Sequence, residues 1–288
     1  MFPIRRSWTA LLAMAVSTIA AFGAETAPPP FTYTDINTVV PGHPELRYSD
    51  LLRQLVPDLR LNETIATGTA PSQPIPHVMG KPFVAHFDAT VSFASFETRT
   101  IQSEGASRLL ILTAVGLRTT PDEPMLLLAF SDDATPKLLD VMDVSMGETV
   151  TIGQPLRIGA QDQAIVTTSD YTADGQIQSA DTLLFMRNGK FDAVGGFFRF
   201  DTVLCGFERT QTLDVTTQKP HAAGPYDDIE VTINDIGRPT KDGCTQPVDL
   251  SPYSDQYSAL YQWNAATGFF DGDSSEIDTL KDLNDTRQ

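Results

Sequence analysis

Residues 179–200, SADTLLFMRNGKFDAVGGFFRF, contain two apolar runs that meet at the dipeptide Asn188-Gly189. This dipeptide accepts the positive φ angles of a type I′ turn, which joins neighbouring antiparallel strands. The stretch therefore predicts a β-hairpin with two facing pairs, Arg187 with Lys190 and Met186 with Phe191. It is the clearest local signal in the chain, and it indicates a fold and not a chemistry.

Similar apolar runs, separated by polar turns, recur along the chain. Residues 83–93 alternate with a period of two, which is typical of a strand with one buried face, and the continuous apolar run 109–115 predicts a strand buried on both faces. Further strands are expected at 125–130, 137–144, 149–152, 164–168 and 228–234. Predicted hairpins pair 126–130 with 138–144, 183–186 with 191–194, and 259–263 with 269–270. The fold class is all-β, an antiparallel hairpin meander that is propeller-like or a large β-sandwich.

Two short helices are expected beside the strands. Residues 44–59 carry apolar side chains near helical spacing and meet Pro57, so we expect a helix whose apolar face packs on the β body. The apolar positions are Leu46, Leu51, Leu52, Leu55 and Val56. The tail 271–284 has a capping Ser or Asp before Glu276 and predicts a short acidic helix. The Pro-rich loop 68–82 divides a linker and helical N-terminal segment, 25–82, from a β-rich domain, 83–288.

The first 24 residues have the three parts of a secretory signal peptide: Arg5 and Arg6, an apolar core at 8–21, and a small-residue exit. The general secretory route is favoured over the twin-arginine route, because no cofactor motif follows. No later window is long and apolar enough to cross a membrane, so the mature chain is expected to be periplasmic or secreted, with no transmembrane segment.

The chain has two cysteines, Cys205 and Cys244, both in the part expected to be exported. Oxidising conditions favour their pairing as a disulfide. Such a bond would stabilise the fold by roughly 3 to 4 kcal/mol. The alternative, a reactive thiol, needs a basic or helix-terminal setting for which the neighbouring residues give little support.

The chain is acidic, with 37 Asp and Glu against 20 Lys and Arg and a net charge of −17. This charge repels phosphate backbones, so a nucleic-acid partner is not expected. The four histidines lack the spacing of metal ligands. Weak calcium candidates, Asp170 with Asp174 and Asp181, and Asp271 with Asp273 and Glu276, lack the EF-hand order. Neither a metal nor a cofactor is expected.

No catalytic residue is named from the sequence. The Gly-x-Ser-x-Gly elbow and the phosphate-binding glycine loops are missing, and pairs such as Asp140 with Asp143 or His86 with Asp88 carry no specific signal. A dense set of aromatic residues is either a partner surface or buried against the N-terminal helix: Phe191, Phe197, Phe198, Phe200 and Phe207.

Two functions are expected from these observations. The first is a non-catalytic binding or scaffold protein of the bacterial cell envelope, whose partner is an envelope protein or polymer. The alternative is a secreted, carboxylate-dependent hydrolase that acts on a glycan or ester. Whether the chain is an enzyme stays open at this point.

Overall fold

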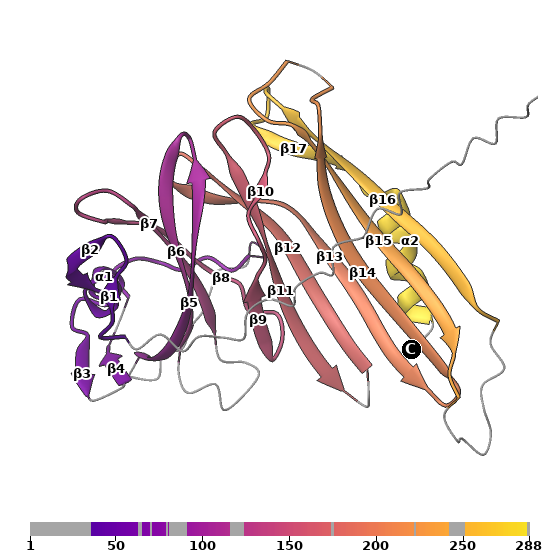
Figure 1. Cartoon of the computed structure of the whole chain (residues 1–288), viewed down its shortest axis with the longest axis horizontal. Coiled ribbons are helices and arrows are strands. Elements are labelled where there is room, and N and C mark those ends of the chain that lie inside the picture. Colours follow the sequence, from indigo (N-terminus) through magenta and orange to yellow (C-terminus); the bar gives the residue numbers. More distant parts are fainter. Residues whose placement is uncertain are drawn as a thin grey trace, which may run out of the picture. The chain divides into compact units, whose positions relative to one another are not determined.

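The chain is built mainly of antiparallel β-strands, in a computed structural model that describes residues 36–62, 65–69, 71–78, 80, 91–115, 124–173, 176–221, 223–241 and 251–286 (Figure 1). The described strands form three sheets, of two, six and nine strands. Helices α1 (Tyr48–Leu55) and α2 (Ser275–Thr286) lie near the two ends of the described chain. The all-β prediction is confirmed. In both large sheets consecutive strands are neighbours, except that the first two strands of the larger sheet both pair with its third, so the described strands form open meanders and no propeller.

The six-stranded sheet has the order β3-β4-β5-β6-β7-β8. Its strands are β3 (Arg60–Asn62), β4 (Ile65–Gly68), β5 (Val91–Ser103), β6 (Ala106–Val115), β7 (Met125–Ser131) and β8 (Leu138–Asp143). The apolar run in β6 is buried on both faces, as predicted. Leu109 and Ile111 pack into a core with α1, whereas Leu110 and Leu112 pack into a second core with β11–β13. The run is continuous because alternate side chains serve two different cores.

The nine-stranded sheet runs from β10 to β17 in chain order, with β9 beside β11. Its strands are β9 (Thr149–Ile152), β10 (Leu156–Arg157), β11 (Gln163–Ala173), β12 (Gln176–Arg187), β13 (Lys190–Leu204), β14 (Phe207–Gln218), β15 (Asp228–Pro239), β16 (Tyr253–Asn264) and β17 (Phe269–Asp273). β13 also contacts β17, and β10 contacts β14. The sheet therefore curls around its own core, to which α2 contributes Ile277 and Leu280.

The β12–β13 hairpin has the predicted register, with Arg187 opposite Lys190 and Met186 opposite Phe191. Its turn residues Asn188 and Gly189 have φ angles of 51° and 70°, as a type I′ turn requires. Farther along β13 a register shift accompanies Gly195, where an added Cβ would lie 2.7 Å from the Tyr261 hydroxyl oxygen. Glycine there lets the Tyr261 ring pack against the strand.

Helix α1 is shorter than predicted. Residues 44–47 belong instead to strand β2 (His43–Arg47), which pairs with β1 (Val39–Val40). The helix begins after Arg47, whose backbone N–H donates to the Asp50 carboxylate at 3.0 Å, and it ends before Pro57. Its buried leucines pack on the six-stranded sheet as expected. The side chain of Leu46 packs on the same core from β2, so its near-helical spacing was coincidental.

Other predicted strands are confirmed in part. The hairpins β7–β8 and β16–β17 pair as expected, with Trp263 opposite Phe270. Strand β14 was not predicted, and β11 and β15 are longer than expected. Most of the predicted strand 83–93 and the domain boundary at residue 82 lie outside the described residues. Neither described helix is long and apolar enough to cross a membrane.

Candidate functional site

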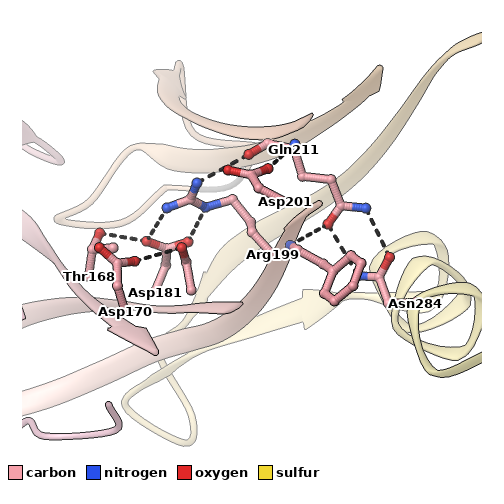
Figure 2. A network of polar contacts seen from close by, with 9 residues as sticks. Thr168, Asp170, Asp181, Arg199, Asp201, Gln211 and Asn284 are labelled. Carbon is pink, nitrogen blue, oxygen red and sulfur yellow. Dashed lines mark hydrogen bonds and ion pairs between the residues drawn. The ribbon is translucent and has the colours of Figure 1, made fainter. Parts of the chain in front are cut away.

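Strands β13 and β14 separate a few residues from their connecting turn, and polar side chains bridge the space between them (Figure 2). Direct pairing covers only three residue pairs, from Leu204 opposite Phe207 to Thr202 opposite Arg209. Beyond this point the Gln211 backbone N–H donates to the Asp201 carboxylate at 2.6 Å, and the Gln211 side-chain oxygen accepts the Phe200 N–H at 2.9 Å. Side chains therefore replace part of the strand ladder.

Arg199 of β13 extends this network toward β11 and β12. Its guanidinium forms a bidentate pair with Asp181, which is almost fully buried, and also donates to the Gln211 carbonyl oxygen at 3.1 Å. Asp181 in turn accepts the Thr168 hydroxyl at 2.6 Å. Burial raises the pKa of Asp201 above its ordinary value, against the hydrogen bond from the Gln211 N–H, which lowers it.

Arg209 of β14 connects the same network to β15 and α2. Its Nε and Nη2 atoms each lie 2.8 Å from one oxygen of Asp235, and Nη2 also donates to the Asn284 side-chain oxygen at 2.6 Å. The amide groups of Gln211 and Asn284 exchange two hydrogen bonds, at 2.9 Å and 3.2 Å. Helix α2 is thereby attached to the sheet by polar contacts as well as by its apolar residues.

The chemistry available in this network is limited because its acids and bases are engaged with one another. Asp170 accepts the Ser179 hydroxyl at 2.6 Å, and the carboxylates of Asp181, Asp201 and Asp235 all accept hydrogen bonds. A general base or nucleophile must face a substrate to act on it. The network is therefore a set of structural cross-links among β11–β15 and α2. No motif in the sequence could have revealed it, since its members come from six separate elements.

Beside the network, a cavity of about 180 Å³ opens between β13 and α2. It is lined by Gln178, Phe198, Arg199, Phe200, Lys281, Asn284 and Asp285. Phe198 is 42 % exposed and lies 6.0 Å from the Lys281 amine, whereas Phe197 is 1 % exposed. Of the aromatic residues singled out in the sequence, Phe198 alone is exposed. Phe191, Phe197, Phe200 and Phe207 are buried, and they pack within the sheets and not against α1.

A second, larger groove of about 720 Å³ lies between β2 and the β7–β8 turn. His43, Glu45, Asp132 and Asp133 line it. Asp132 accepts the Ser107 hydroxyl at 2.6 Å and lies 3.1 Å from His43 Nε2. These two hydrogen bonds lower the pKa of Asp132. The carboxylate lies between the serine and the histidine, which is not the order of a serine-hydrolase triad, where histidine is central.

The other carboxylates and histidines considered in the sequence analysis do not come together in one site. Asp140 contacts Lys190 and the Phe191 N–H, while Asp143 accepts the Ser145 hydroxyl and lies 3.9 Å from His77. Burial raises the pKa of Asp143. His86 and Asp88 lie outside the described residues.

Each acidic residue of the C-terminal calcium candidate accepts a hydrogen bond from a different residue. Asp271 accepts from Asn264, Asp273 from the Ser275 N–H, and Glu276 from the Ser258 N–H. Asp174 lies outside the described residues, and Asp170 and Asp181 belong to the network around Arg199. Within the described part of the chain, no three His, Cys, Asp or Glu side chains are placed to hold a metal ion.

Only one of the two cysteines in the predicted disulfide belongs to the described residues. Cys205 lies in the turn between β13 and β14, is half-buried and is not a free thiol. Cys244 lies outside the described residues. The pairing of the two cysteines therefore stays a prediction.

The fold and its polar network define an all-β antiparallel meander with a C-terminal helix bound to the larger sheet. The chain matches no protein-family model, no curated protein and no solved structure.

Proposed function

We propose that this chain is a non-catalytic binding protein of the bacterial cell envelope, periplasmic or secreted, whose partner is an envelope protein or a cell-surface polymer. One observation carries the proposal: the ring of Phe198 is exposed at a small cavity, while Arg199 in the same lining is paired with Asp181. An exposed ring above an ion-paired arginine is suited to binding a partner group.

The size and lining of the cavity support binding of a partner group and not of a whole small molecule. Small-molecule pockets measure about 300–1,000 Å³, whereas this cavity measures about 180 Å³. One side chain or one ring of a polymer fits such a space. Aromatic residues are enriched at protein interfaces, and Lys281 beside Phe198 adds a cationic contact.

A binding experiment with matched variants tests this proposal. The oxidised exported chain would be used to isolate a stoichiometric partner from envelope extract, at low and high salt and with EDTA. Phe198→Ala should weaken binding about thirtyfold, as expected for an interface residue worth about 2 kcal/mol. Phe269→Ala is the control, because Phe269 is 50 % exposed but lies outside the cavity. Equal losses in both variants would contradict the proposal.

The groove at His43 is the specific observation that favours the alternative, a secreted carboxylate-dependent hydrolase. Its volume falls in the range of ligand pockets, and three carboxylates line it. Panels of chromogenic glycosides and esters test this function. Turnover that is lost in Asp132→Asn and retained in Asp58→Asn would favour the hydrolase, since the Asp58 carboxylate contacts Thr69 elsewhere.

A further inference from the structure

Strand β16 has an outer edge that the other described strands cover only in part. Residues 253–261 pair with β15 on one side, without a register shift. On the other side, β17 pairs only with residues 260–264 (Figure 1). In the described part of the chain, the segment 254–258 therefore has a strand neighbour on one side alone.

The direction of the backbone groups on this segment follows from one contact. The Ser258 N–H donates to the Glu276 carboxylate at 2.9 Å, on the side away from β15. Because backbone groups of alternate residues point to the same side of a strand, those of Ser254 and Gln256 point outward as well. Both residues are exposed. Their outward N–H and C=O groups are available to an added strand.

Only part of the usual protection against strand addition is present at this edge, namely the charged Asp255 and the contact with Glu276 of α2. In natural proteins, proline, lysine, a bulge or short length commonly prevents an edge strand from pairing with another chain. β16 is 12 residues long and contains neither proline nor lysine. The charges on the segment 254–258 are negative. Asp255 is exposed in the segment, and Glu276 of α2 contacts the segment at Ser258. Helix α2 as a whole has four acidic residues and a single lysine.

These charges decide which occupant is favoured. A second copy of this chain, at net charge −17, would bring two acidic edges together. A cationic strand would be attracted instead. We propose that the outer edge of β16 binds an extended, lysine- or arginine-rich segment of another protein, which pairs with residues 254–258 as an added strand. This inference rests on the proposed binding function and names a second contact surface, apart from the cavity at Phe198.

The test uses the full exported chain and a short, labelled peptide of alternating lysine and valine, followed by fluorescence anisotropy. Gln256→Pro removes an outward N–H while leaving the bonds to β15 intact, whereas Gln256→Ala retains that N–H. We expect Gln256→Pro to weaken binding about tenfold, since it removes a hydrogen bond and adds a steric block at the edge. Gln256→Ala should bind as the unchanged chain does.

A modified peptide gives a second measurement that does not depend on folding of a variant. N-methylation at every residue removes the N–H groups of both peptide edges, so the methylated peptide should bind about tenfold more weakly than the unmodified one. Equal binding of both peptides would show attraction by charge alone and overturn the inference, as would no binding at all. Phe198→Ala should not change peptide binding. Loss of envelope binding in Phe198→Ala with peptide binding intact would separate the two proposals.

Discussion

Replacing Arg209 by methionine should strongly destabilise the protein, because it leaves the Asp235 carboxylate buried without its partner. The side chains of Arg209 and Asp235 are 4 % and 0 % exposed, and two hydrogen bonds of 2.8 Å join them. Breaking a buried pair on one side costs about 3–5 kcal/mol. At about 2–4 °C per kcal/mol, the melting temperature should fall by about 6–20 °C.

Urea unfolding followed by circular dichroism measures this loss, and two further variants show its origin. Arg53→Met removes an exposed pair with Asp50 and should cost about 0–1 kcal/mol. The double variant Arg209→Met with Asp235→Leu removes both charges and should recover most of the stability, since apolar replacement of a buried pair is often neutral. A loss below about 1 kcal/mol in Arg209→Met would refute the reasoning, because it would mean that Asp235 is solvated or protonated at little cost.

Three further changes test the hairpin, the network and the predicted disulfide. Gly189→Val should lower the free energy of unfolding by about 1–2 kcal/mol in urea titrations, because Gly189 has a φ angle of 70°. Asp201→Asn should stabilise the protein at neutral pH. Burial raises the folded pKa of Asp201, so its ionised form costs stability, and the gain should shrink as the pH falls through that pKa in a series of melting curves. Replacing Cys205 and Cys244 by serine should cost roughly 3 to 4 kcal/mol, and alkylation of both cysteines without reductant would contradict the pairing.

Local patterns were sufficient to predict several of the strands and some of their pairings. The Asn188-Gly189 turn fixes its own register, because only two residues separate the strands. The apolar run in β6 was informative because both faces of that strand are buried. Strand β14 gave no such signal. Its residues 212–218 alternate half-buried and exposed positions, and its sequence is rich in threonine and glutamine.

The candidate site could not be predicted, because its contacts join distant parts of the chain. Gln211 and Asn284 are 73 residues apart, and each is an ordinary polar residue in its own segment. Phe198 and Phe197 are adjacent and identical in type, and only the packing of β13 and α2 decides which ring is exposed. Side-chain alternation along a strand places the two rings on opposite sides, but it does not decide which side is open.

Part of the acidic composition has a structural explanation. Carboxylates repeatedly accept backbone N–H groups where strands end or separate, as Asp140 does for Phe191, Asp201 for Gln211 and Glu276 for Ser258. Each such contact satisfies a donor that the strand ladder leaves unpaired. Part of the negative charge is therefore internal structure and not a ligand signal. The edge of β16 differs because, within the described part of the chain, Glu276 satisfies the outward donor of Ser258 and not those of Ser254 and Gln256.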